Sequence, residues 1–80
     1  MDKKEILEKL TEIFKEVFSQ KDLVLTDETK VNELESWDSL KNMQMVSSLE
    51  EEFDIQLKFN ELGKLVRVGD IVAIIEKKLD

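Results

Sequence analysis

The chain has 80 residues, which suffices for one compact core and is too short for two, so residues 1–80 are expected to form a single domain. It contains no cysteine and no histidine, which excludes disulfides, thiolates, the commonest general base and metal sites built on soft ligands. No apolar run approaches the roughly 20 residues of a membrane-spanning helix. The first five residues are too polar for a secretory signal, so we expect a cytoplasmic protein without membrane association.

The net charge of −7 is concentrated in the middle of the chain. Residues 27–61 hold ten acidic and three basic residues, whereas acids and bases balance in the two flanks. A negative field repels nucleic acid and attracts basic protein surfaces, so a nucleic-acid-binding role is disfavoured. An acidic surface also serves solubility alone, and the charge by itself leaves both interpretations open.

Long helices are favoured throughout, because the chain has no proline and its two glycines, Gly63 and Gly69, come late. The first helix is predicted from about Lys3 to Ser19 by an apolar stripe at helical spacing. The stripe consists of Ile6, Leu7, Leu10, Ile13, Phe14, Val17 and Phe18.

Residues 20–37 lack this period and are rich in Asp, Thr, Asn and Ser, which predicts a long ordered loop. Its apolar residues are expected to lie on the core; they are Leu23, Val24, Leu25, Val31 and Leu34.

A second helix is predicted from Asp38, as its N-cap, to about Phe53. One or two helical turns are expected over residues 60–65, and the stripe returns over residues 68–79 to predict a last helix. The sequence therefore predicts an all-α domain with three longer helices, one short third helix and a long first loop.

The second helix has an unusual first turn. At about 100° per residue, Leu40 points roughly 140° away from the centre of the apolar arc formed by Met45, Leu49 and Phe53, while Met43 lies at the boundary of the core. An exposed leucine is thus expected beside Ser39. Single exposed apolar residues are common, so a functional interpretation of Leu40 rests on this neighbour.

Residues 37–40, Trp-Asp-Ser-Leu, followed by an amphipathic helix that ends in Leu-Glu-Glu-Glu-Phe at residues 49–53, resemble the signature of the acyl carrier protein family. Residues 64–65 and 68–71 resemble the family's link into its last helix. The resemblance covers nearly the whole chain. It implies an acyl-carrier-protein-like four-helix bundle and a carrier that is not itself an enzyme.

The resemblance also implies that Ser39, within the motif Asp38-Ser39-Leu40, is the attachment point for 4'-phosphopantetheine, transferred from coenzyme A by a separate phosphopantetheinyl transferase that uses Mg²⁺. A serine at the first helical position is exposed, and the free amides of a helix N-terminus stabilise a phosphodiester. The arm would bring the thiol that carries an acyl group as a thioester, so the absence of cysteine is compatible with this function.

The family docks through an acidic second helix on basic patches of acyl-transferring or acyl-ligating enzymes. The residues expected here to bind partners are Leu40, Met43, Gln44, Ser47, Glu50 and Glu51.

Four residues depart from the family's pattern. Lys41 and Gln44 stand where acids are frequent, and both weaken the negative field near Ser39, which favours a specialised carrier over a primary fatty-acid carrier. Trp37 replaces a small residue, and we expect it to belong to the core. Arg67 replaces a frequent Ser or Thr helix cap.

Three alternatives remain. The first is a helical protein-interaction module that is never modified, for which Lys41 and Gln44 are the best support. The second is a hydrolase with Ser39 as nucleophile, which without histidine would need a lysine base such as Lys41. The third is an aminoacyl or D-alanyl carrier, which shares the arm and differs in cargo. The acyl group itself is not encoded in these residues, whereas a monomeric state is expected.

Overall fold

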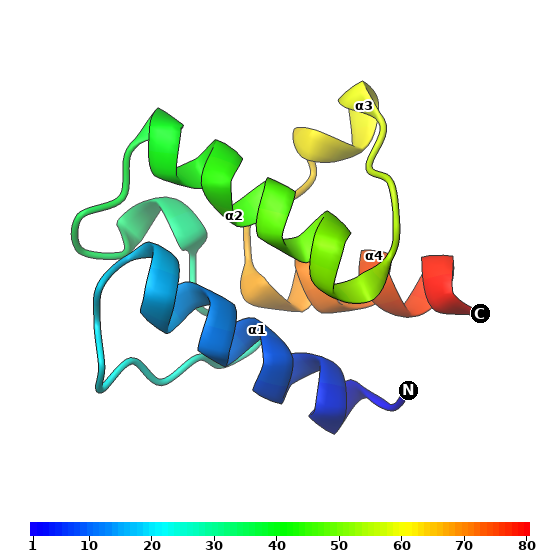
Figure 1. Ribbon diagram of the computed structural model, residues 1–80, viewed down its shortest axis with the longest axis horizontal. Helices are drawn as coiled ribbons and strands as arrows, with labels where there is room; N and C mark the ends of the chain where they lie inside the picture. The colour runs from blue at the N-terminus through cyan, green and yellow to red at the C-terminus, as the bar shows by residue number, and fades with distance from the viewer.

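The computed structural model describes all residues, 1–80, as four helices joined by three connections (Figure 1). The longer helices are α1 (Lys3–Val17), α2 (Ser39–Phe53) and α4 (Val68–Leu79), and α3 (Phe59–Leu62) is a single turn. The first loop contains a 3-10 turn, η1 (Val31–Glu33). The predicted all-α class, with three longer helices, a short third helix and a long first loop, is confirmed. None of the helices has the length and apolar character needed to cross a membrane.

Helix α1 begins where the sequence predicts and ends two residues earlier. The Asp2 carboxylate caps its first turn by accepting a hydrogen bond from the Glu5 amide (2.9 Å). Its last helical residue is Val17, so the predicted end at Ser19 was wrong. Ser19 has a left-handed backbone (φ 54°) that cannot continue a right-handed helix. Phe18 misled the prediction because it is buried although it lies beyond the helix.

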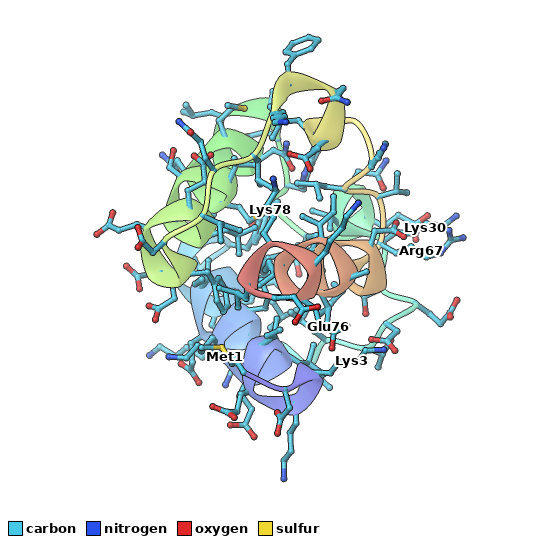
Figure 2. The ribbon with its side chains drawn as sticks, turned by 90° about the vertical axis from the view of Figure 1, so that its right-hand side faces the viewer. Met1, Lys3, Lys30, Arg67, Glu76 and Lys78 are labelled. Carbon is cyan, nitrogen blue, oxygen red and sulfur yellow. The ribbon has the colours of Figure 1, made fainter.

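The core lies where α1, α2 and α4 pack together, with α3 and α1 at opposite ends of the molecule (Figures 1 and 2). Its fifteen buried residues are all apolar, and no polar or charged side chain is buried with them. Five helical positions in α1 and α2 are completely buried: Ile6, Leu10, Phe14, Met45 and Leu49. Because the domain has no disulfide, burial of these side chains is the main term that holds it together.

The first loop is attached to the start of α4 by backbone hydrogen bonds. The Val31 amide donates to the Val66 carbonyl (3.0 Å), and the Val68 amide donates to the Thr29 carbonyl (2.9 Å). These bonds form an isolated antiparallel bridge between Lys30 and Arg67, whose side chains lie close together in Figure 2. They hold the loop in place without a strand.

Most apolar residues of the first loop contact the core as predicted. Leu25 and Val31 are buried, and Leu23 and Leu34 pack against the core while remaining partly exposed. Val24 was predicted wrongly, because its side chain is 78% exposed. An irregular segment has no period from which the direction of a side chain can be deduced.

Helix α3 is held by its polar groups and has no fully buried residue. The Glu61 carboxylate accepts hydrogen bonds from the Lys58 amide (2.8 Å) and from Lys78 Nζ of α4 (2.9 Å). Figure 2 shows Lys78 on the side of α4 that faces α3. The Lys58 amide, followed by Lys78, lowers the pKa of Glu61 from its ordinary value of 4.5. Protonation of Glu61 would therefore weaken the attachment of α3 to α4.

The two glycines offer a matched test of how the first loop packs. The Gly69 amide donates to the Asp27 carbonyl (3.0 Å), and a Cβ at Gly69 would lie 3.1 Å from that oxygen. A Cβ at Gly63 would meet nothing within 4 Å. We expect Gly63→Ala to be neutral or stabilising by up to about 1 kcal/mol and Gly69→Ala to destabilise, because the loop must move away. Urea denaturation of both variants checks this, and equal stabilities would show that the loop yields freely.

Candidate functional site

The start of α2 is fixed by one short hydrogen bond. Asp38 has an extended backbone (φ −154°, ψ 176°), and its carboxylate accepts from the Lys41 amide at 2.7 Å. The Asp38 carbonyl accepts from the Asn42 amide (2.9 Å) and so begins the helical ladder. The predicted N-cap and the predicted helix end at Phe53 are both confirmed.

The segment before α2 is tied to the end of α1, which positions the cap. Ser36 Oγ donates to the Phe18 carbonyl (3.0 Å), and Gln20 Nε2 donates to the Glu35 carbonyl (2.8 Å). Both bonds cross from the first connection to the residues just after α1. The first turn of α2 therefore has a defined location relative to the core.

Ser39 is the first residue of α2 and is exposed. The Ser39 and Leu40 amides have no intrahelical acceptor, because the first amides of any helix lack one, and Asp38 accepts only from the third. Two free amides beside an exposed hydroxyl suit a phosphate ester on that hydroxyl, since helix N-termini favour anions. No histidine or cysteine exists to activate the serine as a nucleophile.

Trp37 lies beside this turn and was predicted to belong to the core. It is half-buried and packs against the core from its edge. Its indole N–H donates to Asn42 Oδ1 (3.3 Å), one turn after Ser39. A small cavity of about 190 Å³ opens here, lined by Trp37, Asn42, Asn32, Val31, Leu65 and Val66. Asn42 was not predicted as part of this region, because an asparagine on a helix is ordinarily solvated.

The outward direction of Leu40 is confirmed, since its side chain is 68% exposed. Met43 was expected at the boundary of the core and is more open than that, with 51% of its side chain exposed. Gln44, Ser47 and Glu51 are exposed on the same helix. These residues form a continuous outward ridge of α2 that begins at Ser39.

Glu50 differs from the other residues predicted to bind partners. It is half-buried, and its carboxylate accepts a hydrogen bond from the Leu57 amide (2.8 Å), which holds the connection to α3. The neighbouring Glu52 is paired with Lys9 of α1 (3.3 Å). Of the three consecutive glutamates, Glu51 alone has no partner within the protein.

Lys41 and Arg67, two of the residues that depart from the family's pattern, lie in different structural settings. Lys41 is half-buried and takes part in none of the four ion pairs, which are Lys9–Glu52, Lys15–Glu12, Lys30–Glu33 and Lys78–Glu61. Arg67 precedes α4 and has no acceptor with which to cap it. Instead, the Asp70 carboxylate accepts from the Arg67 amide (2.9 Å), which satisfies one donor of the first turn.

Phe59 was not predicted as part of the site. It is the first residue of α3 and is 92% exposed, the most exposed of the large apolar side chains. Within a four-residue helix no apolar period can develop, so the sequence could not show whether Phe59 points inward or outward.

Comparison with known proteins gives concordant results. Residues 8–75 match the family described as the phosphopantetheine attachment site. An acyl carrier protein from an Exiguobacterium species is 38% identical over 79 residues, which are 99% of this chain and 100% of that protein. One from Streptococcus thermophilus is 40% identical over 73 residues, 91% of this chain and 95% of its own.

Solved structures agree with the sequences. The solution structure of a holo acyl carrier protein from Geobacter metallireducens superposes with a TM-score of 0.84 at 44% identity, covering 91% of this chain and 84% of that chain. The crystal structure of the acyl carrier protein from Thermotoga maritima gives a TM-score of 0.83 at 29% identity, covering 99% of this chain and 92% of that chain.

The four-helix bundle, with an exposed serine at the start of its second helix, has the fold of the carrier proteins that it resembles. With the family match over most of its length and its relatives over nearly all of it, the chain belongs to the acyl carrier protein family, whose prosthetic group is 4'-phosphopantetheine. Membership implies interaction with a phosphopantetheinyl transferase and with acyl-handling enzymes.

The two leucines of α2 test its orientation. Leu49→Ala should destabilise the domain by about 2–5 kcal/mol, because the side chain is completely buried. Leu40→Ala should cost far less, since its side chain stands mostly in solvent, and should instead impair transfer to or from partner enzymes. Chemical denaturation separates the two, and a larger loss of stability for Leu40→Ala would contradict the observed phase of the helix.

Proposed function

We propose that Ser39 Oγ is the atom to which 4'-phosphopantetheine is attached. The observation that carries the proposal is the exposed hydroxyl at the first position of α2, next to a cap that leaves the Ser39 and Leu40 amides free. The match of residues 8–75 to the attachment-site family includes this position. Asp38 acts by fixing the turn, and Leu40 by presenting an apolar contact beside the arm.

The attachment step requires no catalytic group from this chain. Ser39 Oγ bonds to the phosphorus that bears the pantetheine in coenzyme A, the bond from that phosphorus to the departing nucleotide breaks, and the hydroxyl proton leaves to a base of the transferase. The start of α2 suits this group, because the Ser39 and Leu40 amides have no intrahelical acceptor and Ser39 is exposed. When bound, the arm supplies the thiol that holds an acyl group as a thioester.

The carrier then delivers its acyl group between enzymes of fatty-acid, polyketide or related biosynthesis. The exposed ridge of α2 is where these enzymes would dock, and Leu40, Met43, Gln44, Ser47 and Glu51 are its contact residues. Glu50, whose carboxylate is bonded to Leu57, contributes mainly its charge. A single domain that acts as a monomer in the cytoplasm remains our expectation for the whole chain.

The assignment of Ser39 is tested by intact-mass measurement. Wild-type protein incubated with coenzyme A, Mg²⁺ and a promiscuous phosphopantetheinyl transferase should gain the mass of one phosphopantetheine, and Ser39→Ala should gain none. Helical content should stay unchanged in the variant, because alanine is tolerated at a helix start.

Ser48→Ala is the matched control, since Ser48 lies on the same helix beside α1 and should leave modification intact. If the wild type gains no mass with any transferase tried, the chain is an unmodified interaction module and the proposal fails. If the Ser39→Ala variant gained the same mass, the attachment site would be a different residue.

Lys41 and Gln44 support a specialised carrier, because they leave the first two turns of α2 without a negative side chain after Asp38. If they tune the protein away from primary fatty-acid partners, the double variant Lys41→Asp and Gln44→Glu in its holo form should be a better substrate of a fatty-acid malonyl transferase than holo wild type. The gain should shrink at moderate salt, since exposed charges are screened. Initial transfer rates at two salt concentrations measure this, and equal rates would show that both residues are neutral.

A further inference from the structure

The start of α2 lacks a hydrogen bond that the starts of α3 and α4 have. In α3 the Glu61 carboxylate accepts from the amide of Lys58, the residue that precedes the helix (2.8 Å). In α4 the Asp70 carboxylate accepts in the same way from the Arg67 amide (2.9 Å). The residue at the corresponding position of α2 is Lys41, whose ammonium group can only donate. This reciprocal bond is therefore impossible in α2, and the cap secures its first turn from one side only.

A hydrogen bond between two side chains braces this turn. Trp37 directly precedes the Asp38 cap, and its indole N–H donates to Asn42 Oδ1 (3.3 Å). Apolar side chains at these two positions, just before the cap and in the fourth place of the helix, commonly pack together and fix the direction in which the chain enters a helix. In α2 a hydrogen bond joins the two positions, and Ser39 lies between them in the chain.

Trp37 is itself held by its surroundings. Its amide donates to the Leu34 carbonyl (3.1 Å), and its half-buried side chain packs against the core. Trp37 and Asn42 line one cavity of about 190 Å³ together with Leu65 and Val66 of the link before α4. An indole whose ring lies on the core and whose N–H has a partner satisfies both its apolar and its polar parts. Asn42 is thus bonded to a fixed group of the domain.

We infer that Trp37 and Asn42 are positioning residues for the modification of Ser39, because their hydrogen bond holds the first turn of α2 and so presents the Ser39 hydroxyl in one orientation. This inference rests on the proposed function of Ser39. Helix ends fray, and Ser39 is the first residue of its helix. A small misplacement of a reacting atom lowers the rate of a transfer step strongly, whereas docking through residues further along α2 is unaffected.

The test is the steady-state kinetics of modification of the full chain with coenzyme A, Mg²⁺ and a promiscuous phosphopantetheinyl transferase. Trp37→Phe keeps an aromatic ring and removes the donor, and Asn42→Ala removes the acceptor and keeps a good helix former. Each should lower kcat about three- to tenfold, which is the fold-change that one hydrogen bond corresponds to, and leave the KM for the carrier within about twofold. Asn42→Asp, which keeps an acceptor oxygen, should restore kcat.

Three further variants separate positioning from docking and from a general loss of stability. The double variant Trp37→Phe and Asn42→Ala should be no slower than either single variant, because all of them lack the same bond. Gly69→Ala, in which the added Cβ meets the Asp27 carbonyl of the first loop, should lower stability without lowering kcat. Glu51→Gln should raise KM instead.

The bond can also be followed by fluorescence, because Trp37 is the only tryptophan of the chain. Asn42→Ala should increase quenching of Trp37 by acrylamide, and Asn42→Asp should keep the wild-type value. If Trp37→Phe and Asn42→Ala are modified with the wild-type kcat, or if their losses add in the double variant, the inference is overturned while attachment at Ser39 stands. If the wild type gains no mass at all, the proposed function fails and this inference fails with it.

Discussion

The hydrogen bond from the Lys41 amide to the Asp38 carboxylate is the interaction on which the site depends. It determines which residue begins α2, while burial of the apolar stripe determines how the helix is turned on the core. With Ser39 at the first position, Met45 and Leu49 point into the core and Leu40 points out. Loss of such a cap costs a helix about 1 kcal/mol, but here its larger effect would be on where the serine lies.

The three consecutive glutamates in the last turn of this helix have different structural settings. Glu52 pairs with Lys9 and joins α2 to α1, whereas Glu50 accepts the Leu57 amide and turns the chain toward α3. Only Glu51 has no partner within the protein. Exposed ion pairs contribute little to stability, so the Glu50 hydrogen bond, which satisfies a half-buried amide, is the more important of the two structural contacts.

The sequence predicted what is locally encoded. Asp38 and the apolar stripe of residues 68–79 fixed three helix boundaries correctly, because a cap and a period are properties of neighbouring residues. The exposure of Val24, the end of α1 and the hydrogen bond of Glu50 to the Leu57 amide were not predicted. Periodicity alone does not reveal such features. Phe18 is buried in the core although it lies beyond α1, and Glu50 accepts a hydrogen bond from an amide seven residues further along the chain.

The same distinction applies to the candidate site. Ser39 could be singled out because its hydroxyl, its cap and the exposed leucine are adjacent in sequence. The exposure of Phe59 could not be predicted, since α3 is a single turn that is held by the long-range pair of Glu61 and Lys78. The position of α3 is therefore a tertiary property with no local signal.

These features assign the specificity of the carrier to its surface. The chain has no cysteine and no histidine, the cavity between Trp37 and Asn42 is small at about 190 Å³, and the core is filled by fully buried side chains. What distinguishes one carrier of this family from another must then be read by enzymes from outside, through charge and exposed apolar groups. In this chain the exposed face of α2 combines two apolar residues, Leu40 and Met43, with the unpaired carboxylate of Glu51. A partner that recognises both must be complementary along much of the length of α2, which is a stricter requirement than attraction between opposite charges alone.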